Sequence, residues 1–211
     1  MTVTKKQIVR WLEASAQVMA ANQVYLTQLD SEIGDADHGI NMNRGFGSVL
    51  DQLPVLTDKD IGTILKNTGM ALISSVGGAS GPLYGTFFMR IGAAVAAKEE
   101  LSGQDLHDML QSGIAGIVQR GRAQVGDKTM VDAWNPALEA LKRAIDEHRD
   151  TVSALKLAVA AAQKGMQDTI PLQARKGRAS YLGARSIGHQ DPGATSSYLL
   201  LKTLLDTVEQ G

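Results

Sequence analysis

The chain has 211 residues, with 21 lysine and arginine residues against 22 aspartate and glutamate residues, and no cysteine. The balanced charge argues against a general nucleic-acid binder, which would carry a basic excess. The missing cysteine excludes a disulfide framework, a cysteine zinc site and a thiol nucleophile. The length and the 44% hydrophobic content predict a single folded domain over residues 1–211.

The N-terminal segment is amphipathic and lacks an apolar run followed by a cleavage site, so it does not resemble a signal peptide. The longest apolar runs, such as Ala93–Ala97, fall far short of the ~20 residues that cross a bilayer. We therefore expect a cytoplasmic protein without a membrane partner.

Apolar residues recur at helical spacing along most of the chain, for example at Ile61, Ile64, Leu65 and Leu72. No segment shows a sustained alternation of apolar and polar residues, so we expect no sheet. Helices with one apolar face must pack on each other, which predicts an all-α bundle or closed barrel of eight antiparallel amphipathic helices. The expected helices lie at roughly residues 4–29, 41–53, 59–74, 81–98, 104–122, 130–148, 151–172 and 192–209.

Four residues near helix ends support these boundaries. Pro54 is expected to close the second helix, and Thr151 is a candidate N-cap of the seventh. Asp191 followed by Pro192 predicts an N-cap and a first helical residue, because proline has no N–H group to leave unpaired there.

The connection at residues 30–39 is strongly acidic, with four carboxylates in eight residues at Asp30, Glu32, Asp35 and Asp37. Clustered carboxylates repel each other unless they are protonated or bound to a cation. Mg²⁺ fits best, because it binds through a few carboxylates and leaves positions for phosphate and water. A solvated turn is the alternative on spacing alone, whereas a calcium EF-hand is excluded because its central glycine and final glutamate are missing.

Two polar residues follow this acidic run. His38 is a candidate ligand for metal or phosphate, or a structural hydrogen-bonding residue. Asn41 is a candidate cap of the second helix, or a residue that faces a ligand. The sequence leaves both alternatives open.

Two glycine-containing connections lie further along the chain. Residues 77–82, G-G-A-S-G-P, precede a helix, so their backbone N–H groups could bind phosphate, or they could form a simple turn. Residues 121–129 are similar to a phosphate-binding P-loop, but Asp127 is inserted before the lysine and no strand precedes them. We therefore reject a P-loop.

The last long connection, residues 175–193, is basic in its first half, with Arg178 as a candidate phosphate ligand through its fork of donors. A solvated charged face and an RNA-contacting patch are the alternatives. Together, the acidic, glycine-rich and basic connections indicate a site for a nucleotide and its metal ion.

Several long motifs then identify a family resemblance. They are G-D-A-D-H-G (34–39), N-M-N-R-G-F (41–46), S-S-V-G-G-A-S-G-P-L-Y-G-T (74–86), G-D-K-T-M (126–130) and the stretch 175–196. In order and spacing, they resemble the ADP-binding L subunits of phosphoenolpyruvate-dependent dihydroxyacetone kinases over essentially the whole chain. The resemblance implies a barrel of eight antiparallel helices with the nucleotide at one end.

The resemblance also implies which residues form the site. Asp30, Asp35 and Asp37 would bind Mg²⁺, with two ions expected, and the glycine loop would meet phosphate. Gly121 and Met130 would lie near the base and sugar. The full set implied to bind ADP or ATP is His38, Gly39, Ile40, Asn41, Gly78, Ala79, Ser80, Gly121, Met130, Arg178, Asp191, Pro192 and Gly193.

The implied function is that of a phosphotransferase subunit. ADP would stay bound as a coenzyme, receive a phosphoryl group from a phosphohistidine on an M subunit, and pass it to dihydroxyacetone on a K subunit. Two alternatives are an ATP-dependent kinase subunit with exchanging nucleotide and a regulatory module whose ADP form contacts a transcription factor. A metal-dependent phosphohydrolase is disfavoured, because no water-activating base stands out beyond the aspartates.

Overall fold

Nine α-helices, two 3₁₀ segments and one pair of short strands make up the secondary structure of residues 2–211, which the computed structural model describes. This confirms the expected all-α class. The helices are α1 (Lys5–Ala21), α2 (Gln23–Ile33), α3 (His38–Gln52), α4 (Ile61–Ser75), α5 (Ser80–Ala94), α6 (Gly103–Gly121), α7 (Val131–Asp146), α8 (Thr151–Asp168) and α9 (Pro192–Glu209). The 3₁₀ segments are η1 (Leu53–Val55) and η2 (Arg178–Ser186), and the strands are β1 (Val3–Thr4) and β2 (Glu100–Leu101).

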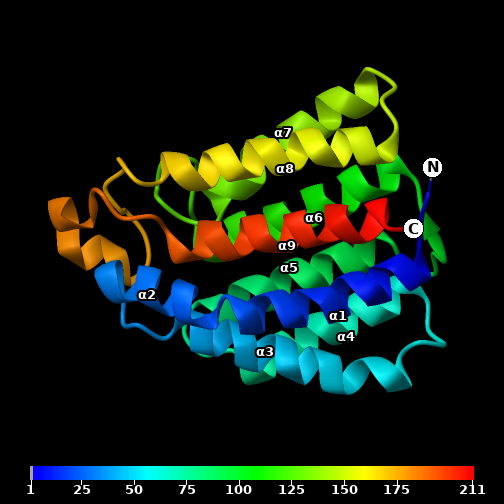
Figure 1. Cartoon of the computed structure of the whole chain (residues 1–211), viewed down its shortest axis with the longest axis horizontal. Helices are drawn as coiled ribbons and strands as arrows, with labels where there is room; N and C mark the ends of the chain where they lie inside the picture. The colour runs from blue at the N-terminus through cyan, green and yellow to red at the C-terminus, as the bar shows by residue number, and fades with distance from the viewer. Residues whose placement is uncertain (1) are drawn as a thin grey trace.

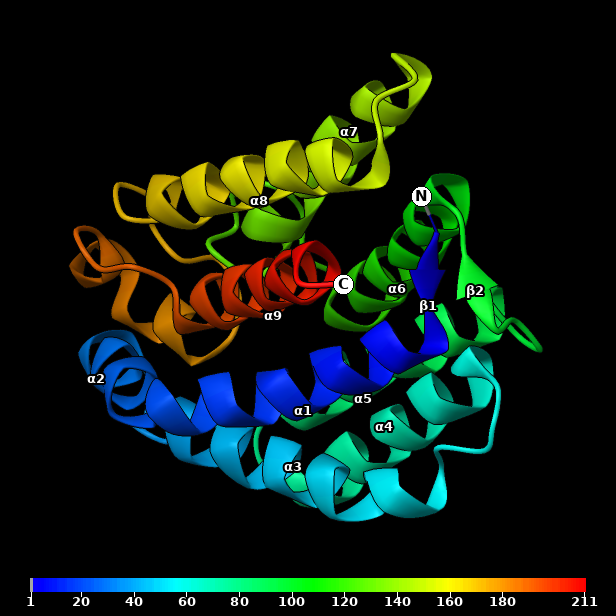
Figure 2. The same cartoon turned by 45° about the vertical axis from the view of Figure 1, so that its right-hand side comes forward.

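The helices pack as a closed ring. Successive helices from α3 to α9 contact each other, α9 contacts α1, and α1 contacts α3. Figures 1 and 2 show α9 running between α8 and α1, so the last helix closes the structure onto the first. Helix α2 lies outside this ring at one end, beside η2. The described chain therefore has one helix more than expected.

Large side chains fill the centre of the ring. Phe88 is fully buried and contacts three other buried rings, with centroid distances of 5.7 Å to Trp11, 6.1 Å to Phe46 and 5.4 Å to Phe87. Phe87 also stacks on Trp134 at 4.8 Å. Because these aromatic side chains come from helices far apart in sequence, their cluster joins opposite sides of the helix ring.

The extra helix arises at Asn22, which divides the expected helix 4–29. Both the backbone N–H and the side-chain amide of Asn22 donate to the carbonyl of Val18. Asparagine competes with the helix backbone in this way, and the chain turns before α2 begins. The expected single helix was therefore wrong, and the break carries the end of α2, with Asp30, to one end of the molecule.

The expectation of no sheet was also wrong, by a small margin. Val3 pairs with Leu101 and Thr4 with Glu100 in an antiparallel ladder. Strands of two residues are too short to produce a period-2 pattern, so the sequence carries no signal for them.

The helix ends agree with the expectations in part. Asp191 caps α9, accepting from the N–H of Ala194 at 2.7 Å, with Pro192 next, as expected. Helix α8 is instead capped by Asp150, so Thr151 is its first residue. Helix α3 begins at His38, and Asn41 therefore lies in its first turn instead of capping it.

Pro54 lies in the 3₁₀ segment that directly follows α3, in keeping with its expected role as a terminator. Among residues 2–211, no helix combines the length and the apolar character needed to cross a membrane.

Replacing Phe88 with alanine is expected to lower the free energy of unfolding by about 3–5 kcal/mol, because it removes a buried ring and leaves a cavity. Met89 is its neighbour on α5 and is 41% exposed. Met89→Ala should change the same quantity by less than about 1 kcal/mol. Urea unfolding of both variants measures the difference, and equal losses would contradict the assigned core.

The buried N-cap of α9 leads to a pH prediction. Burial raises the pKa of Asp191 from 3.8 to about 7, against the opposing hydrogen bond from the N–H of Ala194. Between these two pH values the folded protein keeps a proton that the unfolded chain has lost, so this carboxyl makes the fold less stable as pH rises.

Asp191→Asn keeps a capping oxygen but cannot ionise. In nucleotide-free protein, the variant should gain stability relative to the wild type between pH 4 and pH 7, by up to ~1 kcal/mol per pH unit. Urea unfolding at several pH values measures this difference. A difference that does not change with pH would show that Asp191 titrates normally.

Candidate functional site: a carboxylate-edged cavity at one end of the ring

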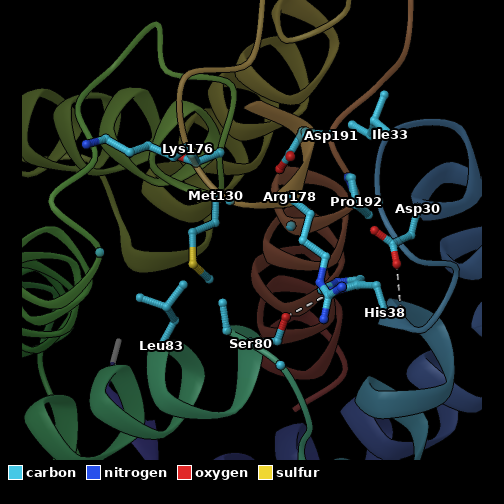
Figure 3. Close-up of a pocket in the computed structure, with 18 of the residues that line it drawn as sticks. Asp30, Ile33, His38, Ser80, Leu83, Met130, Lys176, Arg178, Asp191 and Pro192 are labelled. Carbon is cyan, nitrogen blue, oxygen red and sulfur yellow. Dashed lines mark hydrogen bonds between the residues drawn. The ribbon is translucent and has the colours of Figure 1, made fainter. Parts of the chain in front are cut away.

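A cavity of about 260 Å³ lies where several helix ends and connections meet. Figure 3 shows side chains from the acidic loop, the glycine loop and the basic connection pointing toward one another across it. Its lining is contributed by residues 30–38, 77–84, 117–130, 176–179 and 191–193. The three connections singled out in the sequence therefore come together.

Three carboxylates stand at one edge of this cavity. One ligand oxygen from each of Asp30, Asp35 and Asp37 lies within 4.8 Å of the other two. Asp30 is buried at the end of α2, and its Oδ2 accepts from the backbone N–H groups of Asp37 at 2.9 Å and His38 at 3.2 Å. This fixes the loop but leaves other carboxylate oxygens free, which is the donor set that a hard divalent cation requires.

Gly34 is required for this arrangement. A Cβ atom at this position would lie 2.0 Å from Oδ1 of Asp30, so any side chain would push the carboxylate away. Glu32, the fourth carboxylate of the run, lies outside the cluster and instead meets Nδ1 of His189 at 3.5 Å. The acidic run therefore supplies three carboxylates that could hold a metal ion and one surface contact.

His38 links the acidic loop to two other elements. Its Nδ1 lies 3.1 Å from Oγ of Ser80, on the glycine loop, and its Nε2 lies 2.9 Å from Oγ of Ser196, on α9. Burial lowers the pKa of His38 to about 4, although Asp30 and Asp37 oppose this shift. The ring is therefore neutral at pH 7 and acts through hydrogen bonds.

Tyr84 forms a hydrogen bond with Ser196, which is also a partner of His38. Its hydroxyl lies 2.6 Å from Oγ of Ser196 and 3.0 Å from Oγ of Ser197, and burial raises its pKa. Neither Tyr84 nor Ser196 was expected from the sequence, where each reads as an ordinary polar residue of a helix. Only the hydrogen bonds from Tyr84 on α5 to α9 beside His38 reveal the network.

The glycine loop brings backbone close to the cavity. Gly78 has a φ of +63°, in the left-handed region that favours glycine. A Cβ atom at Gly81 would lie 2.3 Å from the carbonyl oxygen of Val76. Helix α5 starts at Ser80 with no side-chain hydrogen bond to its first turn among the described residues, so its N–H groups are free to bind an anion.

The connection between α8 and α9, residues 169–191, passes over the cavity, and we call it the strap. Arg178 on the strap places Nη2 3.0 Å from Oδ2 of Asp35 and stays 65% exposed. Figure 3 shows its side chain extending across the cavity toward His38 and Ser80. Arg178 is therefore within reach of both the carboxylates and the glycine loop.

Lys128 is a third residue that was not expected from the sequence. Its side chain is buried, and its ammonium group donates to the carbonyl of Thr169 at 2.7 Å and also to the carbonyl of His189. Burial lowers its pKa, while Asp191 and Asp132 oppose this shift. Rejecting a P-loop was correct, because the lysine lies in the connection between α6 and α7.

The far wall of the cavity is apolar. Leu83, Ile117, Ala123 and Met130 line it together with Gly121, the last residue of α6. A flat aromatic ring fits such a wall, where it loses contact with water and gains contact with carbon and sulfur atoms.

Most of the residues implied by the resemblance line this one cavity. Gly39, Ile40 and Asn41 do not; they lie in the first turn of α3, where Oδ1 of Asn41 accepts from Arg44 at 2.6 Å and Ile40 is 47% exposed. Their role toward a nucleotide stays a prediction. Those in the lining are Asp30, Asp35, Asp37, His38, Gly78, Ala79, Ser80, Gly121, Met130, Arg178, Asp191, Pro192 and Gly193.

Comparison with known proteins gives consistent results. The chain is 52% identical over 204 residues to the "PEP-dependent dihydroxyacetone kinase, ADP-binding subunit DhaL" of Escherichia coli, with 97% of each chain covered. It is 48% identical to the corresponding subunit of kinase 2 of Listeria innocua, covering 88% of this chain and 87% of that one.

A solved structure has the same fold. The dihydroxyacetone kinase of C. freundii in complex with AMP-PNP and Mg²⁺ superposes with a TM-score of 0.71 at 25% identity. The match covers 94% of this chain but 33% of that one, so the chain spans about a third of the larger kinase. Residues 32–206 match the DAK2 domain. The chain therefore belongs to the DAK2 domain family.

Proposed function

We propose that this chain is the nucleotide-binding subunit of a phosphoenolpyruvate-dependent dihydroxyacetone kinase. It holds ADP as a coenzyme, accepts a phosphoryl group from a phosphohistidine on an M subunit, and transfers that group to dihydroxyacetone on a K subunit. The products are dihydroxyacetone phosphate and the original ADP. The observation that carries the proposal is the cluster of three aspartates facing a phosphate-type glycine loop across one cavity.

The acidic edge is suited to Mg²⁺, and Asp30, Asp35 and Asp37 are the residues that would hold it, with two ions expected. Bound there, the metal would neutralise phosphate charge during transfer. Asp30 is oriented by the backbone N–H groups of Asp37 and His38, so the cluster is preorganised by the end of α2 and the start of α3.

The phosphate chain would lie between the acidic edge and the glycine loop. The N–H groups at the start of α5 would donate to its oxygens, and Arg178 would add a charged fork from the strap. Phosphoryl transfer needs little covalent chemistry from the protein, so positioning and charge neutralisation are the main contributions of these residues. The base of the nucleotide would lie against Leu83 and Met130.

Part of the site would come from the partners. Within residues 2–211 the one histidine of the cavity is neutral and already bonded on both ring nitrogens, so it is a poor base for a substrate hydroxyl. This supports a base on the K subunit. A contact with a transcriptional regulator in the ADP state stays a further prediction.

A second candidate is an ATP-dependent kinase subunit whose nucleotide exchanges in every cycle. The likeness to the C. freundii kinase, whose structure contains AMP-PNP, favours it. The same residues would bind the nucleotide in both cases, so the two candidates differ in how long ADP stays bound.

Nucleotide content separates the two candidates. Protein purified without added nucleotide and then denatured should release near-equimolar ADP together with Mg²⁺, because a coenzyme survives purification. Chromatography and elemental analysis of the released material measure both. An empty protein that exchanges ATP readily would contradict the coenzyme role.

Asp35→Asn tests the metal cluster. Removing one of three carboxylate charges should weaken Mg²⁺-ADP binding by about tenfold or more, which corresponds to about 1.4 kcal/mol. The variant should therefore gain less thermal stability from added Mg²⁺-ADP, since a ligand stabilises the folded state by mass action. Calorimetric titration and thermal melts measure the two effects.

Asp51→Asn is the matched control, because Asp51 is exposed on α3 away from the cavity. It should bind and melt like the wild type. If Asp35→Asn retains full nucleotide content and melting temperature, Asp35 does not belong to a metal site.

A further inference from the structure

Lys128 is a buried charged residue that the proposed function does not use. Its ammonium group donates to the carbonyls of Thr169 and His189, which lie at the two ends of the strap. A single side chain, anchored between α6 and α7, therefore joins the start of the strap to its end.

Other hydrogen bonds also join the two ends of the strap. The N–H of Gly188 donates to the carbonyl of Ile170 at 2.8 Å, and the N–H of Ala174 donates to Oγ of Ser186 at 2.9 Å. The N–H of Arg175 donates to the carbonyl of Asp127, the residue before Lys128, at 3.0 Å. Hydrogen bonds therefore join the two ends of the strap, residues 169–175 and 186–191, which we call its neck. The neck is also bonded to residues 127–128.

The middle of the strap is held far less. There, η2 contacts α2, and Arg178 pairs with Asp35 across the cavity. Tyr181, at the centre of η2, is 87% exposed. The position of Arg178 over the cavity therefore depends on the bonded neck, on the contacts of η2 with α2 and on this ion pair.

Lys128 carries two energetic costs at one position. Its charge is buried with 1% of the residue exposed, and its backbone φ of +62° lies in the left-handed region that a side chain disfavours. An apolar residue with a negative φ would be buried at this position at a lower cost in free energy. Both costs occur in a residue that lines the cavity next to Thr129 and Met130, which points to a role in the site.

We infer that Lys128 is a positioning residue that latches the strap over the cavity and thereby sets the rate at which ADP leaves. The inference rests on the proposed function, since it takes ADP as the occupant. In this proposal ADP leaves when the whole strap lifts from its neck, and that motion breaks both hydrogen bonds of the ammonium group. The latch explains how a nucleotide can stay bound through many cycles without a covalent bond.

The absence of cysteine from the chain allows a sharp test. Lys128→Cys carries a single thiol, which can be alkylated in denaturant before refolding. Bromoethylamine restores an ammonium group at nearly the length of lysine, whereas 1-bromopropane gives a neutral side chain of the same length. The two products differ only in the charged group that the proposal concerns.

The propyl form should release ADP about tenfold faster or more, measured by chasing labelled ADP with excess unlabelled ADP in the presence of Mg²⁺. The aminoethyl form should release it within about twofold of the wild type. Backbone amides of Ala174, Arg175 and Gly188 should exchange hydrogen faster in the propyl form, while amides in the middle of α5 should not. Lys164→Met, which removes an exposed lysine of α8, should match the wild type.

Equal release rates for the propyl and aminoethyl forms would overturn the latch. Failure of the propyl form alone to refold would also overturn it, because the ammonium group would then serve the fold and not the strap. If the wild type binds no ADP at all, the proposed function fails, while exchange at Ala174, Arg175 and Gly188 still tests whether Lys128 fastens the strap.

Discussion

Repulsion among three carboxylates is the constraint on which the site depends. Asp30, Asp35 and Asp37 place ligand oxygens within 4.8 Å of one another at the mouth of a partly apolar cavity, where like charges are costly. The fold offsets part of this cost by directing two backbone N–H groups at Asp30 and the Arg178 guanidinium at Asp35. The remaining negative charge suits the site to a small cation, as our proposed function requires.

The hydrogen-bonded network of His38 and Tyr84 beside the cluster adds no charge of its own. His38 is kept neutral by burial and is bonded to Ser80 and Ser196. Tyr84 supports Ser196 from α5, so three elements far apart in sequence hold the glycine loop against the acidic loop. The net charge of −1 thus conceals a sorted arrangement, with acids on one side of the cavity and the basic strap on the other.

The sequence predicted those features that depend on local pattern. Apolar spacing predicted the all-α class, and the acidic run together with the family resemblance predicted the three aspartates that the fold brings together. It failed at Asn22, whose local bond to Val18 divides a helix that the neighbouring residues favour. It also failed where a long-range contact decides, because Lys128 is recognisable only once Thr169 and His189 lie beside it. The hydrogen-bonding role of Tyr84 was not predicted for the same reason, since nothing near Tyr84 in the sequence indicates that it lies close to His38.

The central claim is that ADP remains in the cavity while phosphoryl groups pass through it. The direct measurement loads the protein with radiolabelled ADP and supplies the two partner subunits, the phosphoryl donor system, dihydroxyacetone and excess unlabelled ADP. Our account predicts that the label stays with the protein over many turnovers while dihydroxyacetone phosphate accumulates. Loss of the label within a few turnovers would contradict it, because the nucleotide would then be an exchanging substrate.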